Sequence, residues 1–180
     1  MTHTRTPVAT DLPFDLTSLK NYVRIDHQDD DASLVEMGKA AAAGLEHAAN
    51  IALLHQTITA TFNEWSESIS LPVGPFFDLR LDLVTVATRD AAGHLTLKDS
   101  GWWIEGGQWP ILHITGTFTG AALVVSYPAG FGANANDIPA DLGLAILDQT
   151  ASIYDGRGSD KIGASTAAAR IIARYKRVRA

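Results

Sequence analysis

The sequence predicts an α+β fold: a helical bundle framework of two N-terminal and two C-terminal helices, with an inserted small antiparallel β-sheet. Apolar residues recur at helical spacing before residue 55 and after residue 139. Between Gln56 and Tyr127, short β-branched segments alternate apolar and polar side chains instead. No repeat or low-complexity linker separates these zones, so we expect residues 1–180 to form a single domain.

Two helices are expected in the first third of the chain, after a flexible N-terminal arm over residues 1–14. In "FDLTSLKNYVRI", Asp15 is a candidate N-cap, and Leu16, Leu19 and Val23 share one helical face. After the break at "DHQDDD", Asp30 or Asp31 can cap a longer helix. Its apolar face is predicted to carry Leu34, Ala41, Leu45, Ala48 and Ala52.

The region 56–127 is expected to contribute four to six short strands. "QTITATFNEW", "LRLDLVTVAT", "WPILHITG" and "AALVVSY" have the required alternation, and "DAAG" is typical of a hairpin turn. Trp102, Trp103 and Trp109 concentrate here. Because few basic residues are interleaved with them, we interpret these aromatic side chains as core or protein-interface residues rather than a base-stacking platform.

The loop in "SYPAGFGANANDIP" has the order of a phosphate-binding loop, since a β-like run leads through glycines to a helix start. It lacks the Gly-Lys-Ser/Thr sequence, because no lysine lies between Lys98 and Lys161. We therefore interpret it as a structural corner, in which the glycines supply positive φ angles and the last two residues begin a helix. The corner residues are Gly130, Gly132, Asp137 and Pro139.

No catalytic residue, metal site or cofactor site is predicted, and we expect a protein that is not an enzyme. The absence of cysteine excludes thiolate ligands and a thiol nucleophile, and the six histidines include no His-Glu-x-x-His pair. The acidic run at Asp26 and Asp29 to Asp31, beside His27, lacks the glycine and glutamate that a calcium loop needs. Helix capping and a solvated acidic face explain that run.

Charge is unevenly distributed along the chain. Five cations lie in the last eleven residues, so the rest carries a net charge of −11 against −6 for the whole. Residues 165–180 are predicted to form a basic C-terminal helix and tail, in which a stripe of arginines borders the apolar pair Ile171 and Tyr175. No apolar run is long enough to span a bilayer and no apolar leader precedes residue 15, so we expect synthesis in the cytoplasm and no membrane partner.

Three segments in order resemble the head–tail connector (adaptor) proteins of long-tailed bacteriophages and phage-like gene transfer agents. "LTSLKNYVRIDHQDDDASLVEMGKAAAAGLEHAANIALLHQT" is similar to the family's two N-terminal helices with an acidic break. "ISLPVGPFFDLRLDLVTVATRDAAG" resembles its Leu-Pro-x-x-Pro turn, strand and Asp-x-x-Gly hairpin. "YPAGFGANANDIPADLGLAILDQTASIYDGRG" resembles its Tyr-x-Ala-Gly-Tyr-Gly entry into a helix, with Phe131 in place of the usual tyrosine. Together they cover most of residues 16 to 158.

The resemblance implies a virion structural protein at the head–tail junction of a virus or virus-like particle, made in the bacterial cytoplasm. About twelve copies would form a ring beneath the portal protein, extend the channel for double-stranded DNA and offer a platform to a tail-completion or stopper protein. DNA would pass without sequence-specific binding, which the acidic body suits.

We expect the C-terminal segment to dock into the portal, and its truncation to abolish portal attachment while leaving the fold intact. The expected portal-docking residues are Arg170, Ile171, Arg174, Tyr175, Lys176, Arg177 and Arg179. The alternative is a small-ligand binding protein or enzyme whose site lies around the Trp-rich sheet, Trp102 to Trp109, or a protein that binds nucleic acid through the basic tail. Binding through the tail would be steeply salt-dependent, with little affinity for free DNA above about 150 mM salt.

Overall fold

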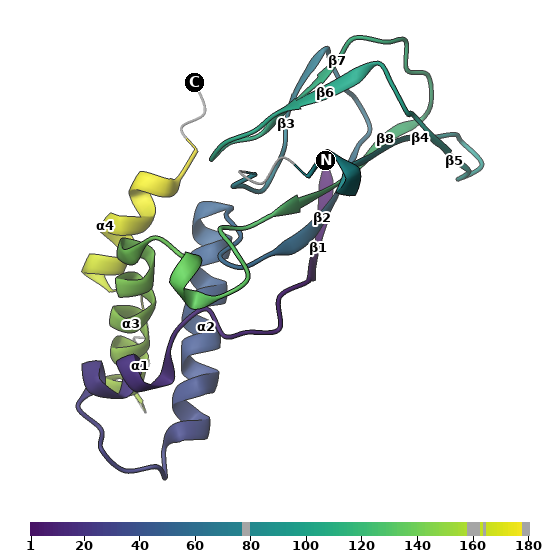
Figure 1. Cartoon of the computed structure of the whole chain (residues 1–180). Coiled ribbons are helices and arrows are strands. Elements are labelled where there is room, and N and C mark those ends of the chain that lie inside the picture. Colours follow the sequence, from purple (N-terminus) through teal and green to yellow (C-terminus); the bar gives the residue numbers. More distant parts are fainter. Residues whose placement is uncertain (77–79, 158–162, 164, 178–180) are drawn as a thin grey trace. The chain divides into compact units, whose positions relative to one another are not determined.

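The computed structural model describes residues 1–76, 80–157, 163 and 165–177. It divides into two compact units, and the chain crosses between them three times (Figure 1). Unit 1 comprises Met1–Ala9 with His55–Phe131, and unit 2 comprises Thr10–Leu54 with Gly132–Ala180. Strands lie in the first and the long helices in the second, so the predicted α+β class is confirmed. That the two units fold together as one domain stays a prediction.

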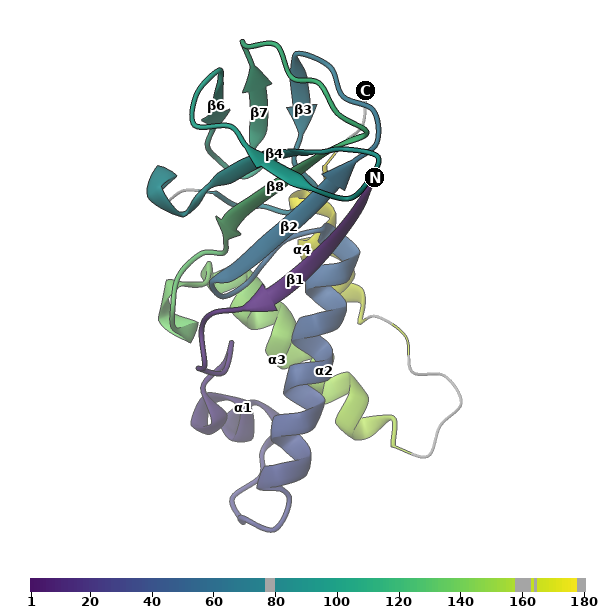
Figure 2. The ribbon, with the colours of Figure 1, turned by 90° about the vertical axis from the view of Figure 1, so that its right-hand side faces the viewer.

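Unit 1 contains two antiparallel sheets. The five-stranded sheet has the order β1-β2-β8-β4-β5, and Figure 2 shows its first four strands side by side. The three-stranded sheet has the order β3-β7-β6. The strands are β1 (Thr2–Pro7), β2 (Gln56–Phe62), β3 (Ser68–Ser70), β4 (Thr85–Arg89), β5 (Leu95–Leu97), β6 (Trp102–Glu105), β7 (Ile111–Ile114) and β8 (Ala122–Ala129). A short 3₁₀ turn, η1 (Leu81–Leu83), precedes β4.

Among the described residues, the region expected to contain four to six strands contributes seven, β2 to β8. The additional strands β3 and β6 have only three and four residues, which is too short for a periodic pattern. The prediction of a flexible arm over residues 1–14 is also wrong for β1. This strand pairs with β2 along its whole length, from Thr2 opposite Thr61 to Pro7 opposite Gln56. Alternating threonines favour the pleated backbone, and the ladder with β2 fixes the N-terminal segment as an edge strand.

A fully buried tyrosine, Tyr127, lies in the core of unit 1 and forms hydrogen bonds to the backbone there. The hydroxyl of Tyr127 on β8 donates to the carbonyl of Val73 at 2.9 Å and accepts from the N–H of the same residue at 3.1 Å. Ile58, Phe76 and Leu112 are buried in the same unit. Burial raises the pKa of the Tyr127 hydroxyl, so it stays protonated and satisfies two backbone groups that have no access to water.

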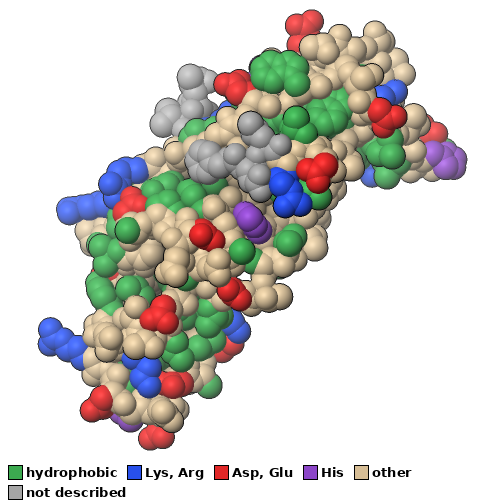
Figure 3. All heavy atoms as spheres, viewed as in Figure 1, with side chains coloured by type: hydrophobic (Ala, Val, Ile, Leu, Met, Phe, Trp, Pro, Cys, Tyr) green, Lys and Arg blue, Asp and Glu red, His purple; other side chains and the backbone are tan. Residues whose placement is uncertain are grey.

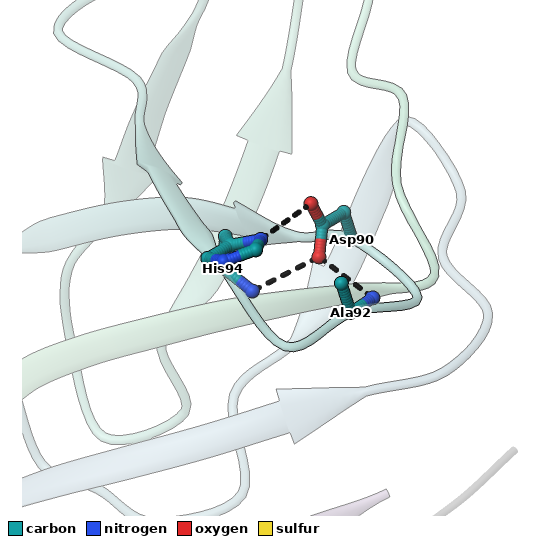
Figure 4. Close-up of polar contacts among 3 residues, drawn as sticks. All are labelled: Asp90, Ala92 and His94. Atoms are coloured by element: carbon teal, nitrogen blue, oxygen red, sulfur yellow. Dashed lines mark hydrogen bonds and ion pairs between the residues drawn. The ribbon is translucent and has the colours of Figure 1, made fainter.

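The predicted hairpin at "DAAG" is confirmed between β4 and β5 (Figure 4). Oδ1 of Asp90 accepts from the N–H groups of Ala92 and His94, each at 2.9 Å, and Oδ2 lies 3.2 Å from Nδ1 of His94. The N–H donated by His94 is the main cause that lowers the pKa of the Asp90 carboxyl. Gly93 has a φ of 94°, which an L side chain rarely adopts.

Unit 2 is built from four helices: α1 (Leu16–Val23), α2 (Asp31–Ala49), α3 (Ala140–Asp155) and α4 (Thr166–Tyr175). Asp15 caps α1 as predicted, since its carboxylate accepts from the N–H of Ser18 at 2.7 Å. Asp30 occupies the N-cap position of α2 without a side-chain capping bond. Leu19, Leu34, Leu142 and Ile146 are fully buried and form the core between the helices.

Tyrosine–aspartate hydrogen bonds tie the helices of unit 2 together at its surface. Tyr22 of α1 donates to Asp148 of α3 at 3.1 Å, and Tyr154 of α3 donates to Asp30 at the start of α2 at 2.7 Å. A third bond, described below, joins α4 to α3. Asp30, which the sequence analysis assigns to a solvated acidic run, thus has a structural partner, Tyr154, on another helix.

Candidate functional site

The C-terminal helix α4 is strongly amphipathic and shorter than the predicted segment 165–180. The side chain of Ser165 accepts from the N–H of Ala168 at 3.0 Å and so begins the helix, which ends at Tyr175. Ala168, Ile171 and Ile172 are buried. Helix α4 is therefore attached to unit 2 by its apolar face and presents its other face to solvent.

The pair predicted as apolar anchors for the portal does not lie on the exposed face. Ile171 is only 7% exposed and packs within the chain's own unit 2. Tyr175 is half-buried, and its hydroxyl donates to Oδ1 of Asp141 on α3 at 2.8 Å. The expectation that truncation of Arg170 to Arg179 leaves the fold intact is corrected for the same reason, because it removes Ile171 and Ile172 from the core.

The cations of this segment are accessible. Arg170, Arg174 and Lys176 are exposed and Arg177 is half-buried, whereas Arg179 lies outside the described residues. Lys and Arg side chains gather at the surface over α4 (Figure 3). Nη2 of Arg174 lies 3.2 Å from Oδ2 of Asp141, so one carboxylate binds both Arg174 and Tyr175. The candidate docking surface is therefore a set of four cations, Arg170 and Arg174 on α4 and Lys176 and Arg177 directly after its end. We call them the α4 cations; the apolar face of α4 itself is already occupied.

The contact of Tyr175 with Asp141 predicts an unusual titration. Burial, with the Asp141 carboxylate as second cause, raises the pKa of Tyr175 from its ordinary value of 10 to about 12. The stability that this contact contributes is complete below pH 10 and is lost as the pH rises through about 12. In a tyrosinate absorbance titration, Tyr175→Phe should remove a late-titrating group; loss of a group with an ordinary pKa would contradict the contact.

The glycine corner combines two different constraints. Gly130 has a φ of 131°, as predicted, and its N–H donates to the carbonyl of Pro75 at 3.0 Å. Gly132 does not have a positive φ; it is required because a Cβ there would collide with the side chain of Asp137. The corner thus needs glycine at both positions, although the conformational reason applies only to the first.

The roles predicted for Asp137 and Pro139 are corrected. Oδ2 of Asp137 accepts from the N–H groups of Ala133 and Asn134 at 2.9 and 3.0 Å, so it closes the loop around the 3₁₀ turn η2 (Ala135–Asp137). It does not cap α3. Pro139 is itself the N-cap residue of α3, one position before the predicted first turn. The fixed φ of proline suits the entry to the helix at either position.

Gly132→Ala is expected to destabilise the protein by about 1–3 kcal/mol, because the new methyl group displaces Asp137 from the loop N–H groups. Chemical denaturation of this variant, of Asp137→Ala and of the double variant measures the coupling. Since both substitutions break the same loop contacts, the double variant should lose much less stability than the two single losses together. Strictly additive losses would contradict this account of the corner.

The Trp-rich sheet carries a defined aromatic contact. Trp103 is 49% exposed, and its ring stacks on His113 of the neighbouring strand with a centroid distance of 4.0 Å. The ring nitrogens of His113 lie 3.0 Å from Oγ of Ser68 and 3.2 Å from Oε2 of Glu105. Sequence reasoning missed this cluster because its members come from three strands whose register a single sequence does not specify.

Within the residues that the structure describes, no group of three or more His, Asp or Glu side chains is arranged to hold a metal ion. In the same part of the chain, no helix is both long and apolar enough to cross a membrane.

Comparison with known proteins relates the chain to solved particle structures. No protein-family model matches it, and no curated protein matches it significantly. A chain from the neck of an empty gene transfer agent (GTA) particle, computed with C6 symmetry, is similar to this chain, with a TM-score of 0.82 and 22% sequence identity. This chain has the fold of that neck protein. The alignment covers 100% of this chain and 97% of the other.

Two further structures give the same result. A chain of the virion of a native gene transfer agent (GTA) particle matches with a TM-score of 0.82. A chain from the neck of a native GTA particle, computed with C12 symmetry, matches with a TM-score of 0.78. Each is 22% identical and is covered to 97%, while this chain is covered completely. Both units therefore belong to the shared fold, as the resemblance of the three sequence segments implies.

Proposed function

We propose that the chain is a structural component of the neck of a gene transfer agent or phage-like particle, and specifically its head–tail connector. The observation that supports this most is the agreement in fold over the whole chain with chains from GTA necks and virions. The three sequence segments that resemble the connector family point to the same role independently of that comparison. In this proposal the protein is not an enzyme and needs no cofactor.

The proposed assembly is a ring of about twelve copies beneath the portal, closed by heterologous contacts between different faces of neighbouring chains. The C6 and C12 symmetries of the similar neck particles are compatible with such a ring. The ring extends the channel for double-stranded DNA and offers its distal face to a tail-completion protein. Portal binding is assigned to the α4 cations, with Arg179 as a further candidate outside the described residues.

Co-sedimentation of the purified chain with portal rings from the same gene cluster tests the proposal. We expect saturable binding that weakens as salt rises, because exposed cations carry the contact. Portal rings from an unrelated phage serve as the control. Absence of association at low salt, with a folded chain and intact rings, would contradict the connector role.

A further inference from the structure

One face of the five-stranded sheet carries a regular array of hydroxyl groups. On β1 and β2, threonine occupies every second position, and the strand register places Thr2 opposite Thr61, Thr4 opposite Thr59 and Thr6 opposite Thr57. Side chains two residues apart on a strand point to the same face, so these six threonines lie together. We call this surface the threonine face.

The array continues across the next two strands. Ser126 of β8 lies between Thr59 of β2 and Thr85 of β4, so the row from Thr4 to Thr85 crosses four strands. The Thr59 and Ser126 hydroxyl oxygens are 3.4 Å apart, which confirms that both side chains are on one face. The threonines of β1 are exposed and those of β2 are half-buried, whereas the alternate residues of β2, such as Ile58, are buried on the opposite face.

The strand residues of the threonine face carry no acidic side chain, although the protein as a whole is acidic. The whole chain contains 20 Asp and Glu residues, yet none of the strand residues on this face of β1, β2, β4 and β8 is acidic. Among these strand residues the one cation is Arg89, at the end of β4. A surface without carboxylates does not repel phosphate, and serine and threonine hydroxyls are donors that proteins use to contact the nucleic-acid backbone.

The composition of this face is less suited to a contact between subunits. The cores of protein interfaces are enriched in aromatic residues, methionine and arginine. None of the residues that β1, β2, β4 and β8 place on this face is aromatic or methionine. Its exposed large apolar residues on the sheet are Leu95 and Leu97 of the short edge strand β5, opposite Arg89 and Ala87. A second copy of the chain is therefore the less favoured occupant.

We infer that the threonine face lines the channel and contacts the backbone of passing double-stranded DNA. This inference rests on the proposed connector function. Neutral hydroxyls form hydrogen bonds to phosphate or to its bound water without releasing counterions, so they add little salt-dependent affinity. Such a lining lets the duplex slide without being retained, whereas lysine or arginine in the same positions would hold it.

The absence of cysteine makes a site-specific test direct. Thr4→Cys, carrying a photoactivatable cross-linker, is assembled into DNA-filled particles, with Ser70→Cys as the matched control; Ser70 is exposed in the same unit, on the other sheet. Irradiation should give a protein–DNA adduct at position 4 and none above background at position 70. A cross-link from position 4 to another protein chain, or no cross-link at all, would overturn the inference.

Whether the chains are incorporated into particles distinguishes a failure of this inference from a failure of the proposed function. If the two labelled chains and the unlabelled chain all fail to enter particles, the connector role is wrong. If only the position-4 chain is excluded, the face is a subunit contact and the inference is wrong. As a second measurement, Thr4→Lys should slow DNA release from assembled particles while Thr4→Val should not; equal release from both would also overturn it.

Discussion

Tyr127→Ala is expected to remove most of the stability of unit 1. Truncation of a fully buried aromatic residue costs about 3–5 kcal/mol. In addition, the N–H and C=O of Val73 lose their partner in a buried site, which costs about 1–3 kcal/mol more. The sum is comparable to the whole stability of a typical domain, about 5–15 kcal/mol. Urea denaturation followed by circular dichroism measures the loss.

Two matched variants separate the contribution of the Tyr127 hydroxyl group to stability from that of its ring. Tyr127→Phe keeps the ring and removes only the hydroxyl, so about 1–3 kcal/mol should be lost. Tyr22→Phe removes a hydroxyl from a 41% exposed tyrosine that donates to Asp148, and should cost well under half as much because water replaces the bond. Equal effects of Tyr127→Phe and Tyr22→Phe would contradict the role assigned to the buried hydroxyl.

Replacement of the α4 cations is expected to abolish portal attachment. The variant changes Arg170, Arg174, Lys176 and Arg177 to glutamine and leaves the buried face of α4 in place. Exposed ion pairs contribute about 0.2–1 kcal/mol each, so four together account for about 1–4 kcal/mol per copy. In the proposed ring of about twelve copies the contact is repeated, so this loss would multiply and attachment of the whole ring should fail. Co-sedimentation with portal rings is the measurement.

The control for this variant is Lys39→Gln, which removes an exposed cation from α2 and breaks only a surface ion pair with Glu36. It should bind portal rings normally. The fourfold variant should keep its circular dichroism spectrum and unfolding midpoint nearly unchanged, since only Arg174 has a described ionic partner among the four. A folded fourfold variant that still attaches at physiological salt would show that α4 is not the docking element.

Local sequence signals predicted the parts of the fold that local physics determines. Asp15 is an N-cap because its carboxylate reaches an N–H three residues ahead, and Gly130 occupies a conformation that disfavours other residues. The hairpin at Asp90 likewise depends on contacts within five residues. Such features are readable from a short window of sequence.

Features that depend on distant partners were not predictable in this way. Residues 2–7 form a strand only because β2, more than fifty residues later, is available to pair with them. In the sequence, Ile171 lies beside arginines and is therefore readily interpreted as an exposed anchor; only the packing of α4 shows that it is buried. The threonine face was also missed, although its signal, threonine at alternate positions of 2–6 and 57–61, is present in the sequence; its significance appears only with the register of four strands.

Electron microscopy of portal rings mixed with the purified chain tests the central claim most directly. The account predicts an added ring of density beneath the portal, in which the fold of this chain can be placed and α4 approaches the portal. Portal rings without added density at any salt concentration, in the presence of the folded chain, would contradict it.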